Sequence, residues 1–172
     1  MLFANENQDS FNLYNIRSKN RAIEFYSFLI GKSFQFSQDE NGEELILENE
    51  YYRIVFTHDQ DCCESVFIED VIGELSDLND SPLLMAECVK SHDASGYESQ
   101  THTWYKFATI NGYVTIRFWG GSNGYYSESV DVYVTDKSTG QIESIGASPY
   151  GTLAHDAEKT FELIVREIRQ GS

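Results

Sequence analysis

The sequence predicts an α+β fold: a single domain, residues 1–172, with one mainly antiparallel β-sheet on which an N-terminal and a C-terminal α-helix pack. Residues 99–135 are the densest run of aromatic and β-branched residues, and Asn111-Gly112 and Asn123-Gly124 divide them as turns would divide a three-stranded meander. Apolar residues recur at helical spacing in residues 18–30 and 153–169. A chain of 172 residues can bury one core and is too short to expect two domains.

Local patterns predict the elements in order along the chain. Ser18 can cap the first helix, and Gly31 ends it. Strands are expected at 33–38, 44–48, 51–57, 83–90 and, shorter, 141–145, with a loop at 92–98. Residues 58–82 are ambiguous, because their apolar residues fit both helical spacing and strand alternation. The second helix carries an apolar stripe of Ala154, Ala157, Phe161, Ile164, Val165 and Ile168.

The register of the predicted meander sorts its side chains into two faces, because side chains alternate along a strand. With Asn111-Gly112 as a two-residue loop, the cross-strand pairs are Ile110 with Tyr113, Phe107 with Ile116, Tyr105 with Phe118, Lys106 with Arg117, and Trp104 with Trp119. The expected core face holds Val114, Ile116, Phe118, Val130, Val132 and Val134. The opposite face holds His102, Trp104, Lys106, Arg117, Trp119, Asp131 and Tyr133. A terminal helix over this second face would make it core rather than a site.

Negative charge is concentrated in one segment. The formal net charge is −16 at pH 7. Residues 39–80 hold fourteen acids and one base, Arg53, which is −13, whereas the rest of the chain holds fourteen acids and eleven bases, which is −3. Such a segment disfavours nucleic acid and anionic membranes as direct partners, since phosphate binding needs clustered Lys and Arg. It favours a basic partner, cations or solubility alone.

An acidic surface is therefore the leading candidate for partner binding. Its expected residues are Asp39, Glu40, Glu43, Glu44, Glu69, Asp70, Glu74 and Asp77. The bland alternative is a solvated acidic face without a partner.

Targeting and redox signals favour a cytoplasmic protein. The polar N-terminus lacks the basic and apolar regions of a signal peptide, and no run of about 18 apolar residues predicts a transmembrane helix. Three cysteines, two of them adjacent, argue against a disulfide framework and for a reducing compartment.

The segment from His58 to Glu64 gathers His, Asp, Cys and Glu side chains. Adjacent cysteines do not match the zinc patterns, in which two to four residues separate the thiolates, so neither a metal nor a cofactor is expected. A nucleophilic Cys62 or Cys63 with His58 as base is a second interpretation, and neighbouring acids oppose it. The favoured interpretation is structural: Asp61 caps a short helix, Glu64 returns a bond to the cap N–H, and one cysteine packs in the core. No catalytic residue is assigned.

The alternative function is a small-molecule or nucleotide-signal binding protein, or an enzyme, that uses the GGSNGYYSE loop and the Cys62/Cys63 segment. Three glycines in the stretch from Trp119 to Ser129 would let backbone approach a ligand closely, although no phosphate-loop ending is present. Like charges at Lys106 and Arg117 need neutralising, either by Asp131 or by an anionic ligand held between tryptophans. The candidate ligand-binding residues are Trp104, Lys106, Arg117, Trp119, Asn123, Tyr125, Tyr126 and Glu128.

Three motifs, QDCCESVFIEDVIGEL, SPLLMAE and TWYKFATINGYVTIRFWGGSNGYYSESVD, resemble a domain of unknown function found mainly in bacteriophage and prophage proteins. The resemblance covers about residues 29–134 and leaves the two predicted terminal helices as additions. It implies a phage-derived protein in a bacterial cytoplasm and brings no activity. The leading hypothesis is a non-enzymatic accessory protein that binds and inhibits a basic host protein, such as a nucleic-acid-binding or defence protein, by mimicking nucleic acid. A virion or assembly component is a third possibility.

Overall fold

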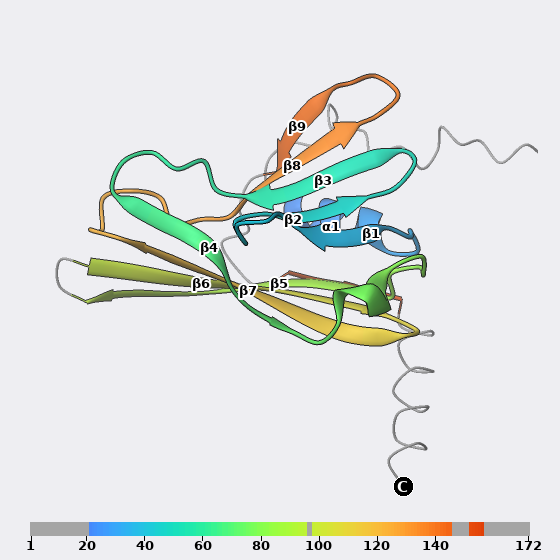
Figure 1. Ribbon diagram of the computed structural model, residues 1–172, viewed down its shortest axis with the longest axis horizontal. Helices are drawn as coiled ribbons and strands as arrows, with labels where there is room; N and C mark the ends of the chain where they lie inside the picture. Colours follow the sequence, from blue (N-terminus) through green and yellow to red (C-terminus); the bar gives the residue numbers. More distant parts are fainter. Residues whose placement is uncertain (1–20, 96–97, 146–151, 157–172) are drawn as a thin grey trace, which may run out of the picture.

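The computed structural model describes residues 21–95, 98–145 and 152–156, and their strands form two five-stranded antiparallel sheets (Figure 1). The first sheet has the order β1 (Gln35–Gln38), β2 (Leu45–Glu48), β3 (Tyr52–Thr57), β8 (Asp131–Asp136) and β9 (Ile142–Ile145). The second has the order β10 (Thr152–His155), β5 (Met85–Ser95), β6 (Glu98–Thr109), β7 (Gly112–Ser122) and β4 (Glu64–Ile72). A helix, α1 (Arg21–Leu29), and a 3-10 turn, η2 (Leu75–Leu78), complete the described elements.

The predicted α+β class is wrong, because two sheets take the place of one sheet covered by two helices. Residues 153–156 are the described part of the predicted C-terminal helix, and three of them, 153–155, belong to strand β10, which pairs with β5 in antiparallel register. Backbone pairing with an available strand edge outweighs a local helical pattern, since propensity is a weak prior against tertiary context. The N-terminal helix prediction overlaps α1 in part. Residues 18–20 and 157–169 of the two predictions lie outside the described residues.

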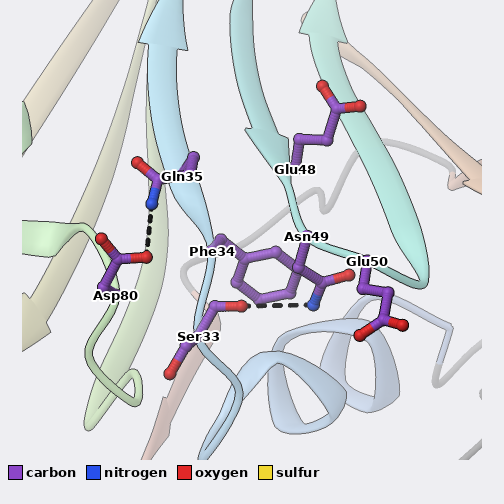
Figure 2. Close-up of a pocket in the computed structure, with 7 residues that line it drawn as sticks. All are labelled: Ser33, Phe34, Gln35, Glu48, Asn49, Glu50 and Asp80. Carbon is purple, nitrogen blue, oxygen red and sulfur yellow. Dashed lines mark hydrogen bonds between the residues drawn. The ribbon is translucent and has the colours of Figure 1, made fainter.

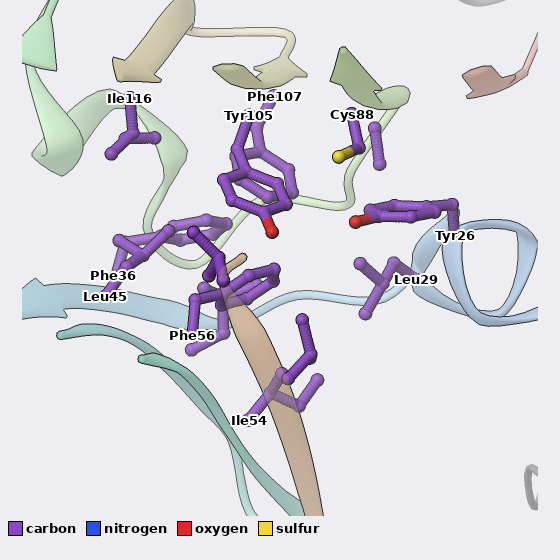
Figure 3. Packing of buried hydrophobic residues seen from close by; sticks show 14 of the residues in the cluster. Tyr26, Leu29, Phe36, Leu45, Ile54, Phe56, Cys88, Tyr105, Phe107 and Ile116 are labelled. Carbon is purple, nitrogen blue, oxygen red and sulfur yellow. The ribbon is translucent and has the colours of Figure 1, made fainter. Parts of the chain in front are cut away.

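The core lies between the two sheets, with α1 beside it (Figure 3). Phe56 of β3 meets Tyr105 of β6 with ring centroids 4.7 Å apart, and Phe36 of β1 meets Phe107 of β6 at 5.3 Å. Such aromatic pairs contribute about 0.5–1.5 kcal/mol beyond the area that they bury. The helix adds the buried side chains of Phe25, Tyr26 and Leu29. All six residues predicted for the core face of the meander are buried, so that prediction is confirmed: Val114, Ile116, Phe118, Val130, Val132 and Val134.

The predicted three-stranded meander is wrong at its third strand. Strands β6 and β7 form a hairpin in the second sheet, but β8 crosses to the first sheet and pairs with β3 and β9. Eight residues, 123–130, connect β7 to β8, which is enough chain to change sheets. Val132 and Val134 stay buried because the sheets pack face to face. Asp131 and Tyr133 consequently do not share a face with the residues of β6 and β7.

The register of the β6–β7 hairpin differs from the prediction by two residues. Thr109 pairs with Gly112, so Lys106 faces Thr115 and Trp104 faces Arg117. Neither Asn111 nor Gly112 has the positive φ that a type I′ turn at these two positions requires. A Cβ on Gly112 would lie 2.7 Å from the Cβ of Asp77, and the Thr109 hydroxyl donates to the Asp77 carbonyl at 2.6 Å. Close packing against η2 therefore sets the turn. A shift of two keeps every side chain on its predicted face.

Most shorter strands match their predictions. Strands β1, β2, β3 and β9 lie within the predicted segments, and that part is confirmed. The ambiguous stretch forms β4 and η2 in succession, separated by Gly73 at φ 105°. The expected loop at 92–98 is wrong where the structure describes it, because β5 and β6 continue their ladder to the pair Ser95 and Glu98.

Candidate functional site

The turn between β1 and β2 carries four of the predicted acidic residues. We call residues Asp39–Glu44 the acidic hairpin. The Asp39 carboxylate accepts the backbone N–H groups of Glu43 at 2.7 Å and Glu44 at 2.8 Å, and Gly42 has φ 70°. A short polar side chain that bonds its own turn and a glycine in the left-handed region are the expected turn chemistry. The turn is therefore defined by its sequence, and its remaining carboxylates project from a fixed backbone.

Strand β4 lies against the acidic hairpin. The backbone N–H of Ile68 donates to the carbonyl of Gly42 at 2.8 Å. Immediately after Ile68 the β4–β7 register shifts at a bulge, which contains Glu69 and is followed by Asp70. Six of the eight predicted acidic residues thus lie along one boundary between the two sheets. We call the acidic hairpin together with Glu69 and Asp70 the acidic edge.

The remaining two predicted acids lie apart from the acidic edge. Glu74 and Asp77 follow the end of β4, and Asp77 packs against Gly112 at the β6–β7 turn. Within the described residues, no hydrogen bond or ion pair joins either side chain to the acidic hairpin. The structure therefore divides the predicted acidic surface in two.

Within the acidic edge, carboxylates differ in how far the fold already uses them. Glu69 lies 3.1 Å from Nε of Arg117 and 3.7 Å from His102, and Asp70 lies 3.9 Å from Nη2 of Arg117. The Arg117 Nε–H is not aligned for a hydrogen bond, so these contacts are ion pairs without full hydrogen-bond geometry. Glu40 and Glu43 are exposed, and no described side chain pairs with their carboxylates.

Both cations of the alternative site have partners within the fold. Arg117 is neutralised from β4, not by Asp131 as the sequence suggested, and Lys106 lies 3.9 Å from Glu87 of β5. The sequence prediction missed all three acids, Glu69 and Asp70 on β4 and Glu87 on β5, since their positions beside these cations follow only from strand pairing. Cross-strand opposite charges are the expected arrangement in an antiparallel sheet.

The two tryptophans lie half-buried on the face of the second sheet that points away from the core. Trp119 contacts Phe67 with ring centroids 5.4 Å apart, and Trp104 stacks on His102 at 5.6 Å. In the observed register Trp119 faces His102, so the predicted Trp104–Trp119 pair does not form. The face is an aromatic strip across β4, β7 and β6, not a clamp around an anion.

The loop after β7 is organised by a buried carboxylate. Glu128 is 7% exposed and accepts hydrogen bonds from the hydroxyls of Ser99, Thr101 at 2.9 Å and Ser122 at 2.5 Å. Burial by itself raises the pKa of this carboxyl. Hydrogen bonds from the Ser122, Ser99 and Thr101 hydroxyls lower the pKa, and together they outweigh burial, so the pKa lies below its ordinary value. Glu128 therefore anchors the loop instead of facing a ligand.

The other loop residues predicted to bind a ligand are spread over the surface. Tyr125 is 86% exposed, and its ring packs on that of Tyr126 with centroids 5.4 Å apart. The Asn123 side chain accepts the backbone N–H of Tyr125 at 3.1 Å, so it shapes the loop itself. The alternative site residues are not brought together around a cavity.

The turn from β3 to β4 is built on a His–Glu contact. His58 donates from Nδ1 to the carbonyl of Ser129 at 2.7 Å, and its Nε2 lies 3.2 Å from Glu64. Glu64 also accepts the backbone N–H groups of Asp61, Cys62 and Cys63, and the Asp61 amide is the main reason that the pKa of Glu64 is lowered. The predicted return bond from Glu64 to residue 61 is present, but no helix follows it, so the capping-box interpretation is wrong.

The cysteines depart from the sequence interpretation. Cys62 and Cys63 are both exposed and joined by a disulfide, whereas the sequence argued against disulfides and placed one of the two in the core. The buried free cysteine is Cys88, whose pKa is raised by burial.

Asp59, in the turn from β3 to β4, accepts a hydrogen bond from the Tyr133 hydroxyl at 2.6 Å and raises the pKa of that phenol to about 12.

A pocket of about 450 Å³ opens where β1 begins and the β2–β3 turn approaches Asp80 (Figure 2). It is lined by Ser33, Phe34, Gln35, Glu48, Asn49, Glu50 and Asp80. Its polar groups are largely engaged, because Gln35 donates to Asp80, Asn49 donates to Ser33, and Glu48 pairs with Arg53 at 3.0 Å and Lys137 at 2.8 Å. No local sequence pattern indicates this pocket, since three segments distant in the chain form its walls.

Two further observations bound the site. Across residues 21–95, 98–145 and 152–156, no three His, Cys, Asp or Glu side chains converge as metal ligands would. The described helices are too short or too polar to cross a bilayer.

Comparison with known proteins identifies the family. Neither the curated proteins nor the solved structures contain a match to this chain. A family model described as a domain of unknown function, DUF7448, matches residues 27–132, nearly the stretch over which the motifs resemble such a domain. The match covers more than half of the chain and includes the acidic hairpin, β4 and the β6–β7 hairpin. The chain therefore belongs to the DUF7448 family.

Proposed function

We propose that this protein is an acidic, phage-derived accessory protein that acts in a bacterial cytoplasm by binding and inhibiting a basic host protein. The acidic edge occupies a site on that partner which otherwise takes nucleic-acid phosphates. The observation that carries the proposal is the hydrogen bond between Ile68 and Gly42, which holds the acidic hairpin beside Glu69 and Asp70. A basic host protein of the defence or nucleic-acid-binding class fits this chemistry.

The distribution of committed carboxylates supports this surface over the rest of the acidic segment. Glu48, Glu64 and Asp59 already serve Lys137, His58 and Tyr133 within the fold. Glu40 and Glu43 keep their charge exposed at the turn. Exposed charges on a fixed backbone attract an oppositely charged partner at long range and raise its association rate.

The alternative, a small-molecule or nucleotide-signal site, has less support from the geometry. Lys106 and Arg117 are paired with Glu87, Glu69 and Asp70, so an anionic ligand would have to compete with carboxylates for them. The Glu128 carboxylate already accepts hydrogen bonds from three hydroxyls of the fold. Two carboxylates of the acidic edge, Glu40 and Glu43, need no such displacement, because no described side chain pairs with them.

Charge reversal in the acidic hairpin tests the proposal. The Glu40→Lys/Glu43→Lys variant and the wild type would be used to capture proteins from bacterial lysate at low and high salt. A matched control is Glu24→Lys/Glu50→Lys, which makes the same charge change at exposed positions away from the hairpin turn. The partner is expected to bind the hairpin variant about tenfold more weakly, because two attractive contacts become repulsive at about 0.2–1 kcal/mol each. Binding of the control is expected to match the wild type.

The captured partner then allows a test of whether this protein inhibits nucleic-acid binding. The wild-type protein should displace nucleic acid from the purified partner. The hairpin variant should leave that nucleic acid bound to the partner. Wild-type binding should also weaken as salt rises, since exposed charge attraction is screened. A partner held equally by all three proteins, or held unchanged at high salt, would refute the acidic mimic.

A further inference from the structure

Cys62 and Cys63 form an exposed pair in the turn between β3 and β4. Their sulfur atoms are bonded to each other, so both side chains lie on the same side of the turn. The third cysteine, Cys88, is 1% exposed on the core face of β5. Any soluble thiol or disulfide that reaches the folded protein therefore meets only the adjacent pair.

The backbone of this turn is fixed around one carboxylate. The N–H groups of Cys62 and Cys63 donate to the same Glu64 oxygen, at 3.2 and 3.1 Å, and Asp61 donates to the other. His58 connects Glu64 to the carbonyl of Ser129 on the β7–β8 connection. The side-chain exposure of Glu64 is 2% and that of His58 is 4%. A bond between the two sulfurs restricts the backbone that presents these amides, so the state of the pair and the order of the turn are coupled.

We propose that Cys62 and Cys63 are a reversible thiol–disulfide exchange site for low-molecular-weight thiols and disulfides of the glutathione class. Oxidation begins when one cysteine thiolate attacks the small disulfide, which forms a mixed disulfide and releases one small thiol. The second cysteine then displaces the other small thiol and closes the bond between Cys62 and Cys63. The pair loses two electrons and two protons, and the small disulfide gains them as two thiols; reduction is the reverse sequence.

The adjacency of the two cysteines and their exposure indicate that the disulfide is reversible and not structural. The bond closes no loop between distant parts of the chain, so it adds little of the chain-entropy stabilisation that structural disulfides provide. Both cysteines are exposed residues, and exposed disulfides are those that exchange with small thiols. A disulfide of this kind in a reducing compartment is transient, which fits a redox-responsive site. The reducing compartment is taken from the proposed function, whereas the exchange reaction itself needs no partner protein and is tested without one.

Thiol counting on the full-length protein tests the exchange. The protein would be incubated with oxidised glutathione or with reduced glutathione, quenched, unfolded and alkylated, and its mass measured. The wild type is expected to carry three alkylated cysteines after reduction and one after oxidation, with no retained glutathione. Cys62→Ser and Cys63→Ser are matched controls, because each leaves Cys88 and one exposed thiol and removes only the ability to close the pair.

Two outcomes would overturn the proposal. One is oxidised wild type that keeps three alkylated cysteines. The other is oxidised protein that retains glutathione or becomes a disulfide-linked dimer, as the single-cysteine controls should, which would show separate thiols instead of a pair. Amide hydrogen exchange adds an independent readout: the amides of Asp61, Cys62 and Cys63 should exchange several-fold faster in the reduced protein, and equal rates in both states would contradict the coupling to Glu64.

Discussion

Glu128 shows how a single buried charge can organise a loop. Its carboxylate lies where β6 begins and β7 ends, and hydroxyls from Ser99, Thr101 and Ser122 surround it. Buried carboxylates are costly unless they are fully hydrogen-bonded. The three hydroxyls meet that requirement, and in return the loop that leads to β8 is held against the second sheet.

Replacing Glu128 with Gln should destabilise the protein while leaving its shape intact. The amide presents donors toward hydroxyls that now donate to a carboxylate, and loss of a hydrogen bond to a charged group costs about 1.5–3 kcal/mol. The measurement is the free energy of unfolding in urea, with Glu50→Gln as the control at an exposed position. Equal stability of the two variants would mean that the buried contacts of Glu128 do not hold the loop.

At the residue scale, the sequence predicted on which face of the sheet a side chain lies more reliably than which residue it contacts. Alternation along β7 correctly separated Ile116 from Arg117, because the period of a strand is local information. The partners of Arg117 come from Glu69 and Asp70, nearly fifty residues earlier in the chain. No local pattern encodes a contact over that separation, so a plausible neutraliser, Asp131, was chosen instead.

At the element scale, Gly120 explains how the β7–β8 connection can pack directly on strand β7. A Cβ at this position would lie 2.7 Å from the carbonyl oxygen of Glu128 and 3.2 Å from a methyl group of Val66. The missing side chain lets the β7–β8 connection lie directly on the strand. Glycine is used here for close approach of two backbones.

The Gly120→Ala variant should lose about 1–3 kcal/mol of stability, because the added methyl group overfills a packed site and displaces the backbone at Glu128. Thermal and urea unfolding would measure the loss, and Ser144→Ala on the exposed side of β9 is the control. If Gly120→Ala were as stable as the control, the close approach would not constrain the fold.

The strands themselves were predictable, whereas hairpin register was not. Short runs of alternating residues bounded by Asn-Gly and Asn-Glu located β1, β2 and β3 correctly. The register of β6 against β7 depends on Asp77, which packs on Gly112 from another element. A turn motif read alone suggests positive φ, and only the packed structure shows that the glycine serves contact instead.

At the scale of the whole molecule, the sequence could not reveal that the strands divide into two sheets. Residues 123–130 can serve as a long hairpin loop or as a crossover, and local chemistry does not choose between them. In the structure β8 lies in the first sheet, where Val132 and Val134 are buried in the core. For the candidate site, the segregated charge of residues 39–80 was visible in composition, but its division between the acidic edge and the Glu74–Asp77 region required the fold.

Acid should unfold the molecule through its hydrogen-bonded carboxylates. Amide and hydroxyl donors hold the pKa values of Glu64 and Glu128 below their ordinary value of 4.5. A lowered folded-state pKa contributes stability above the unfolded value, and that stability is lost as pH falls through the folded value. Asp131 acts in the opposite sense, since burial raises its pKa and its favourable contribution exists at low pH.

The Glu64→Gln/Glu128→Gln variant should therefore be less stable than wild type at neutral pH but lose less stability on acidification. Urea midpoints measured from about pH 7 to about pH 3 should converge for the two proteins at the acid end. Curves that stay parallel over this range would show that these two carboxyls do not set the acid limb.

The contact between Gly42 and Ile68 has a consequence for self-association. Strand β4 is an outer strand of its sheet, and outer strands offer free backbone groups on which another chain can add a strand. The β1–β2 turn takes up the N–H of Ile68 and surrounds that position with carboxylates, so a neighbouring copy meets both an occupied hydrogen-bond donor and repulsive charge. Outer strand β9 shows Ile142 at 65% exposure. Strand addition, and the aggregation that follows from it, is therefore disfavoured at the Ile68 position of β4.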